Sequence, residues 1–238
     1  LDFSSKKTYG APLINENVVY ATGYNCRGKD CEAEVLAIPL EAGSSSGRAI
    51  YQIKSEIVGS PVMHGNTLIF GTSKIGDLDE SSQGYLLGIE VKINEQPAEG
   101  NSPGRRTVIG RELWKFGVGG AVWSTPTIVG DTVYFGAMDG FVRALDLSTF
   151  DPDDLSRKPP KEIWRFHTGG AVTARPVVSE DRLFIGDFDG DFYALDLHVR
   201  RSDPEGNQIL PGKEWIYKSD SWFWASALVD DGSVYASN

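Results

Sequence analysis

Two segments of the chain repeat each other closely: Trp114-Lys-Phe-Gly-Val-Gly-Gly-Ala-Val122 and Trp164-Arg-Phe-His-Thr-Gly-Gly-Ala-Val172. In each copy a proline follows, and after it come a Val- and Ile-rich stretch and a polar turn. A second apolar stretch comes next, followed by Asp-Gly and then by Ala-Leu-Asp-Leu. The two copies stay in register without a gap up to Leu147 and Leu197. Repetition of this length indicates one supersecondary unit that stacks on copies of itself.

More divergent copies extend the repeat over the whole chain. A proline that precedes an apolar run recurs about every fifty residues, and Ala227 takes its place in the last copy. Short alternating strands with glycine-containing turns at this period predict an all-β protein, a β-propeller of four-stranded antiparallel blades. We expect a single domain, 1–238, with blades at about 8–55, 56–118, 119–168 and 169–218 and an incomplete blade at 219–238. This is a partial ring of about four and a half blades.

The residues inside each repeat have structural roles. Asp139-Gly140 and Asp189-Gly190 suit tight hairpin turns, because glycine adopts positive φ angles without strain. Large rings at the outer strand of a blade can cover the joint with its neighbour, and we assign this role to Trp114, Trp164 and Trp215.

A known family shares these features. The Ala-Leu-Asp-Leu segments, the tryptophan after them and the Gly-Gly-Ala-Val segments resemble the pyrroloquinoline-quinone-like (quinoprotein-like) propeller repeat. That family includes quinone-dependent alcohol dehydrogenases. It also includes the non-enzymatic lipoprotein scaffold of the bacterial outer-membrane barrel-assembly machinery, and the chain resembles this scaffold more than the enzymes. Rings of this family have about seven or eight blades, so the resemblance implies that the chain is a fragment. Polar additions at 151–154, 203–206 and 94–106 depart from the family pattern, and we expect loops there.

Composition narrows the class of partner. Lys and Arg number 23 against 33 Asp and Glu, a net charge of −10, which disfavours nucleic acid. No apolar run reaches the roughly 18 residues of a membrane span. The first residue is Leu1, which we interpret as a processed start. Open strand edges at both ends of a partial ring predict pairing between chains, that is, an edge-strand dimer.

The only two cysteines are Cys26 and Cys31. Their spacing fits a disulfide at a hairpin tip, which would place the protein in an oxidising, extracytoplasmic compartment such as the periplasm or the cell surface. The alternative is a pair of free surface thiols.

Aromatic side chains gather near one predicted end of the innermost strands. Tyr9, Trp123 and Trp224 share one position when the repeats are aligned, Trp222 is close to it, and Arg175 lies directly before its own proline. Rings at an axial mouth can stack on a sugar, a quinone or an aromatic-rich peptide. The alternative is packing between blades.

Asp187, Asp189 and Asp191 place three carboxylates within five residues, a pattern that can attract Ca²⁺. The alternative is an Asp-Gly hairpin with solvated flanks. The quinone dehydrogenases of the resembled family use adjacent cysteines over the cofactor, a feature that Cys26 and Cys31 do not match. No histidine or cysteine spacing suits zinc or haem.

The sequence therefore favours a non-catalytic extracytoplasmic scaffold that binds a protein or peptide, with no cofactor and no catalytic residue. Two alternatives stay open. One is a fragment of an oxidoreductase dependent on pyrroloquinoline quinone and calcium, and the other is a polysaccharide-binding module.

Overall fold

The computed structural model describes residues 7–27, 30–40, 47–73, 83–97, 105–154, 156–202 and 209–238. These residues form eighteen strands and one short 3₁₀ turn, Leu147–Thr149, with no α-helix among them. The strands make four four-stranded antiparallel sheets and one two-stranded sheet. The prediction of an all-β, propeller-like fold is therefore confirmed.

Each sheet is built from strands that are consecutive in the chain. The first two sheets contain β1 (Leu13–Asn15), β2 (Val18–Arg27), β3 (Asp30–Pro39) and β4 (Arg48–Ile53), then β5 (Val62–His64), β6 (Thr67–Ser73), β7 (Gly84–Gln96) and β8 (Arg105–Val118). The third and fourth contain β9 (Thr127–Val129), β10 (Thr132–Gly136), β11 (Phe141–Asp146) and β12 (Lys161–His167), then β13 (Val177–Ser179), β14 (Arg182–Gly186), β15 (Asp191–Ser202) and β16 (Ile209–Lys218). The two-stranded sheet contains β17 (Leu228–Asp230) and β18 (Ser233–Tyr235).

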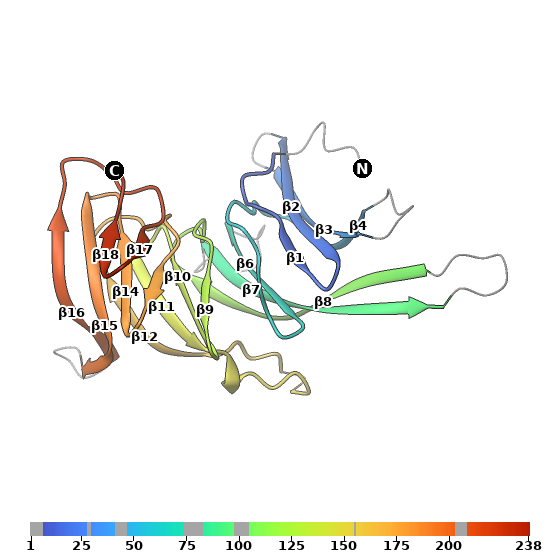
Figure 1. Cartoon of the computed structure of the whole chain (residues 1–238). Coiled ribbons are helices and arrows are strands. Elements are labelled where there is room, and N and C mark those ends of the chain that lie inside the picture. The colour runs from blue at the N-terminus through green and yellow to red at the C-terminus, as the bar shows by residue number, and fades with distance from the viewer. Residues whose placement is uncertain are drawn as a thin grey trace.

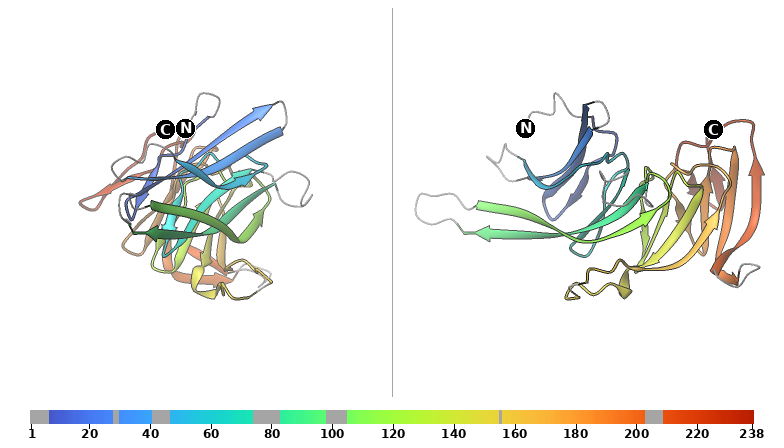
Figure 2. Two further views of the ribbon diagram at one scale, coloured as in Figure 1. Left: turned by 90° about the vertical axis from the view of Figure 1, so that its right-hand side faces the viewer. Right: turned by 180° about the vertical axis from the view of Figure 1, so that it is seen from behind.

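The sheets follow one another in chain order along an open arc (Figures 1 and 2). Their first strands are neighbours on one side, where β5 contacts β9, β9 contacts β13 and β13 contacts β17. Their last strands are neighbours on the other side, where β4 contacts β8 and β12 contacts β16. This radial stacking is the arrangement of propeller blades.

The core consists of four apolar clusters, one in each joint between successive sheets. Trp114 and Trp164 are 2% and 1% exposed because the following four-stranded sheet covers each ring. Trp215 occupies the same place in the fourth sheet, yet it is 41% exposed, because the sheet that follows has only two described strands. In the first sheet Tyr51 replaces the tryptophan, and its hydroxyl donates to Glu112 Oε2 at 2.5 Å across the joint.

Every four-stranded sheet has the same irregularity in strand pairing beside the aromatic residue of its fourth strand, which is Tyr51, Trp114, Trp164 or Trp215. The pairing of third and fourth strands shifts register between Val35 and Leu36, Gly88 and Ile89, Ala144 and Leu145, and Ala194 and Leu195. A β-bulge leaves one extra residue on one strand and re-aims the side chain beside it. The four bulges therefore set the direction of one ring at each joint.

Close backbone contacts account for the repeated Gly-Gly and Asp-Gly pairs. A Cβ at Gly120 would lie 2.4 Å from the Asp139 backbone nitrogen, and one at Gly170 would lie 2.5 Å from that of Asp189. Gly190, at φ +84°, provides the positive dihedral angle that its hairpin turn requires.

The expected polar loop at 94–106 is partly strand, the one at 151–154 lies outside the strands, and the one at 203–206 lies outside the described residues. Long hairpin strands β7 and β8 take up both ends of the 94–106 addition and project beyond the neighbouring sheets (Figure 1). Strand β15 continues to Ser202, where it pairs with Ile209 of β16. Added residues in these two blades thus extend a hairpin instead of leaving the sheet.

Candidate functional site

Two exposed indoles and one partly buried phenyl ring meet at one end of the last joint. Phe188 stacks on Trp222 with ring centroids 5.5 Å apart and an angle of 13°, and it lies 4.5 Å from Trp224. The two indoles are 5.7 Å apart. Trp222 and Trp224 are 53% and 58% exposed. We call Phe188, Trp222 and Trp224 the aromatic platform.

The residue between the two tryptophans fixes the platform to the core. Phe223 is 3% exposed, and its ring lies 5.2 Å from that of Phe192. Its backbone nitrogen donates to the Asp187 carbonyl at 3.0 Å. Alternating residues of an extended segment point to opposite sides, so burial of Phe223 turns both indoles outward. The platform is a surface with a rigid base.

The other predicted ligand-binding residues lie elsewhere, each with its own partner. Trp123 donates from Nε1 to Ser73 Oγ at 3.1 Å, and the Tyr9 ring lies 6.0 Å from that of Tyr24. Arg175 donates from Nε to Thr127 Oγ1 at 2.9 Å. Of the predicted set, the structure brings only Trp222 and Trp224 together.

Sequence reasoning missed Phe188, the third member of the platform. It lies in the turn between β14 and β15, directly before Asp189-Gly190. The equivalent residue of the preceding blade is Met138. The sequence feature that could have indicated Phe188 is its large ring in a turn whose other residues are polar or small.

Backbone and lysine partners occupy two of the three predicted calcium ligands, Asp187 and Asp191. Asp187 is fully buried, and its carboxylate accepts from the backbone nitrogens of Gly170, Asp189 and Asp191 at 2.9 to 3.2 Å. The Asp191 carboxylate accepts from Lys218 Nζ at 3.0 Å through both oxygens. Asp187 is thus committed to the hairpin turn and Asp191 to an ion pair.

Burial sets the acidity of two groups at this turn. Removal of Asp187 from water raises the pKa of its carboxyl group, and the three backbone donors offset part of that rise. Burial also raises the pKa of Tyr193, whose hydroxyl donates to the Thr168 carbonyl and stays protonated. The negative charges of Asp187 and Asp191, and a hydrogen bond from the Tyr193 hydroxyl to Asp191 Oδ2 at 3.3 Å, add to the rise in the pKa of Tyr193.

Among the residues that the structure describes, the predicted calcium ligands do not converge. Within the described ranges, one group of three His, Cys, Asp or Glu residues has its ligand atoms within 4.8 Å of one another, and it comprises Cys26, Cys31 and Glu56. The aspartates near the platform do not form such a group.

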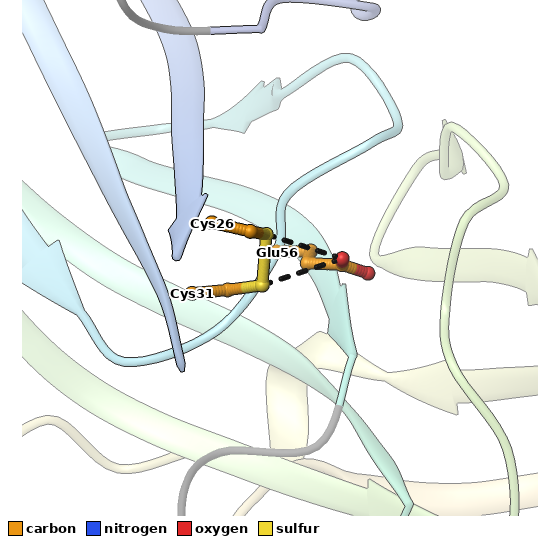
Figure 3. Close-up of side chains that lie close together, drawn as sticks. All are labelled: Cys26, Cys31 and Glu56. Carbon is orange, nitrogen blue, oxygen red and sulfur yellow. Dashed lines mark hydrogen bonds between the residues drawn. A yellow bond between two sulfur atoms is a disulfide. The ribbon is translucent and has the colours of Figure 1, made fainter. Parts of the chain in front are cut away.

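The group of Cys26, Cys31 and Glu56 lies at the tip of the β2–β3 hairpin in the first sheet. Cys26 and Cys31, paired directly across β2 and β3, form a disulfide. Glu56 Oε1 lies 3.5 Å from both sulfur atoms (Figure 3). Glu56 follows β4, and nothing in the sequence signals that it reaches the hairpin tip.

Comparison with known proteins supports the fold alone. No protein-family model matches the chain, and no curated protein does. Among solved structures, the computationally designed Ika8 protein aligns at 13% identity over 96% of this chain and 67% of its own, with a TM-score of 0.55.

Two natural proteins also align. BamB from Moraxella catarrhalis, a β-propeller, aligns at 11% identity over 96% of this chain and 79% of its own, with a TM-score of 0.50. Sqt1 from Chaetomium thermophilum aligns at 15% identity over 81% of this chain and 44% of its own, with a TM-score of 0.54. At these identities the similarity shows a propeller-like β fold and no activity.

In the part of the chain that the structure describes, no helix has the length and apolar character for a bilayer crossing.

Proposed function

We propose that this chain is a non-catalytic, extracytoplasmic β-propeller scaffold that binds a protein or peptide through the aromatic platform. The observation that carries the proposal is the exposure of Trp222 and Trp224, at 53% and 58%, around a buried Phe223. Clustered exposed rings on a rigid base are typical of interaction sites, where tryptophan often dominates the binding energy. The likeness to BamB supports a scaffold role by analogy only.

The negative charge near the platform favours a particular kind of partner peptide. Asp189 and Asp220 are exposed and flank the platform residues in the chain, and the whole chain carries a net charge of −10. Carboxylates at the rim of an apolar patch attract cationic side chains and repel acidic ones. The expected partner is therefore a segment with apolar or aromatic anchors and neighbouring Lys or Arg.

The disulfide supports the proposed compartment. Disulfides persist where the environment is oxidising and are rare in the cytosol. The Cys26–Cys31 bridge thus favours the periplasm or the cell surface over the cell interior.

A second surface lies along β18. Among the described residues this strand pairs only with β17, and a groove lined by Phe192, Trp215, Tyr217 and Val234 lies beside it. A strand that added to β18 would cover Trp215, as the fourth sheet covers Trp164. The predicted edge-strand dimer would use such an edge, and sedimentation velocity over a range of concentrations would detect it.

Binding to a peptide array tests the platform. We expect segments with aromatic and basic residues to bind, and Trp222→Ala and Trp224→Ala each to weaken binding at least about tenfold. Ile109→Ala is the control, because this side chain is 48% exposed on β8 and belongs to neither the platform nor the groove beside β18. Unchanged binding in both tryptophan variants would refute the proposal.

Exposed indole faces also favour the polysaccharide alternative, since a flat ring can stack on a sugar as well as on a side chain. A glycan array with the same three variants separates the two functions. Platform-dependent binding to glycans without binding to peptides would replace the peptide proposal with the polysaccharide one.

A further inference from the structure

We propose that Cys26, Cys31 and Glu56 form a binding site for a thiophilic divalent cation, such as Zn²⁺, when the disulfide is reduced. The three side chains converge from the β2–β3 hairpin and from the segment after β4 (Figure 3). The sequence did not predict zinc because Glu56 joins the two cysteines only in the fold, but two thiolates and one carboxylate are a ligand set that Zn²⁺ accepts. The proposal does not depend on the aromatic platform.

The position of the glutamate matches a tetrahedral site. With Zn–S distances of about 2.3 Å and a Zn–O distance of about 2.0 Å, tetrahedral angles place sulfur and oxygen about 3.5 Å apart. The distances from Glu56 Oε1 to Cys26 Sγ and to Cys31 Sγ are both 3.5 Å. The carboxylate oxygen therefore lies within reach of a cation between the two sulfur atoms, and a small side-chain adjustment keeps it there when they separate.

Only the two sulfur atoms have to move. They are 2.04 Å apart in the disulfide and would lie about 3.8 Å apart around a tetrahedral ion. Cys26 and Cys31 are direct cross-strand partners, so both side chains point to one face of the hairpin. Small side-chain rotations can open the gap while the strand pairing stays intact.

A hydrogen-bond network holds the glutamate in this orientation. Its Oε2 accepts from Ser73 Oγ at 3.0 Å, and the Ser73 backbone nitrogen donates to the Glu56 carbonyl at 3.1 Å. Trp123 Nε1 donates to the same Ser73 hydroxyl at 3.1 Å. Contacts of this kind orient a ligand before a metal binds and raise the affinity of the site.

The oxidised pair gives the carboxylate no proton to accept, because disulfide sulfur carries none. Reduction by a dithiol transfers two electrons and two protons to the pair, breaks the S–S bond and leaves the reductant as a disulfide. The cation then displaces both thiol protons and binds two thiolates and Glu56 Oε1. Three protein ligands leave the fourth position to water. Cation binding therefore requires the reduced state.

Cobalt titration tests the site in the whole chain. Protein reduced anaerobically with a phosphine, which takes up the oxygen of water, is titrated with Co²⁺ and followed by the thiolate-to-cobalt charge-transfer band and the tetrahedral d–d bands. We expect one Co²⁺ per chain, its displacement by Zn²⁺, and no such bands with the disulfide intact. Glu56→Gln should weaken binding at least about tenfold, and Ser73→Ala by a smaller factor.

The matched control is Glu32→Gln, which removes an exposed carboxylate directly beside Cys31 in the sequence and should leave affinity unchanged. Circular dichroism of each reduced variant checks that the sheets are intact. Folded, reduced protein without the cobalt bands would overturn the proposal. So would Glu56→Gln with wild-type affinity, because the cysteine pair would then bind without the carboxylate.

Discussion

Removal of Trp164 should destabilise the protein more than removal of Trp215, although both rings occupy the same place in their blades. Trp164 is closed in between two four-stranded sheets at 1% exposure, and Trp215 is 41% exposed beside the two-stranded sheet. The pair of alanine variants therefore measures how much a complete joint contributes beyond a half-covered one.

The magnitude follows from the buried area. A tryptophan side chain that buries about 200 Å² contributes about 5 kcal/mol at about 25 cal/mol per Å². Trp164→Ala should lose nearly all of this and also leave a closed cavity, while removal of its buried, unpaired Nε1 returns about 1 kcal/mol. Trp215→Ala loses about three-fifths of the burial and leaves a space that water fills. We expect costs of about 5 and at most about 3 kcal/mol.

Urea unfolding followed by far-ultraviolet circular dichroism provides the assay, because the signal does not depend on the number of tryptophans. Tyr217→Ala, on the same strand as Trp215, calibrates the cost of an exposed ring and should be the mildest of the three. Equal costs for Trp164→Ala and Trp215→Ala, within about 0.5 kcal/mol, would refute the reasoning, because coverage by the next sheet would then contribute nothing measurable.

Three further changes test other features. Asp139→Ala removes both bonds to the buried Arg143 guanidinium, at 2.9 and 2.6 Å, and should cost about 3 kcal/mol in urea unfolding. Burial raises the pKa of Asp187, so the ionised form is disfavoured in the folded state. Wild-type stability should therefore fall relative to Asp187→Asn as pH rises above about 4, as urea midpoints at pH values of about 4 and 7 would show. Replacement of Cys26 and Cys31 by serine opens a short loop and should cost about 2 kcal/mol, measured by thermal unfolding without reductant.

Each of these has an informative contrary outcome. Asp189→Ala is the matched control for Asp139→Ala, because Tyr193 replaces the arginine in that blade, so equal costs would show that the ion pair contributes little. Parallel pH profiles for wild type and Asp187→Asn would mean that Asp187 has the same pKa in folded and unfolded protein. A serine variant as stable as wild type would remove any structural role of the disulfide.

The repeat made the fold predictable, but contacts between repeats were less accessible to sequence reasoning. Trp114 and Trp164 lie in the joints because a ring on the outer strand faces the next sheet. Sequence alone did not reveal that the third ring of this set is partly exposed, because exposure depends on the neighbouring sheet and not on Trp215 itself. Local propensity describes a blade, whereas burial is a property of two blades.

The candidate sites differ in the same way, because some of their residues are neighbours in the chain and others meet only in the fold. Trp224 was predicted from its position in the repeat alignment, and Trp222 because it lies two residues before Trp224 in the chain. Glu56 was not, since it reaches the disulfide only through the way β4 leads into the second sheet. Asp187 shows the limit of spacing as a guide, because three nearby acidic residues fit either a cation site or an Asp-Gly hairpin, and the chain folds backbone N–H groups onto the Asp187 carboxylate.

The bulge before each joint ring has a consequence for how such chains change length. The strand pairing on one side of the bulge can change without affecting the pairing on the other side. The third and fourth strands can therefore be lengthened beyond the bulge without rotating the ring beside it. The second blade shows this in its long β7–β8 arm, and Trp114 remains buried at 2% exposure. Rim hairpins should therefore accept inserted peptides, tags or whole domains at their tips, and an engineer who wished to decorate this scaffold would begin there.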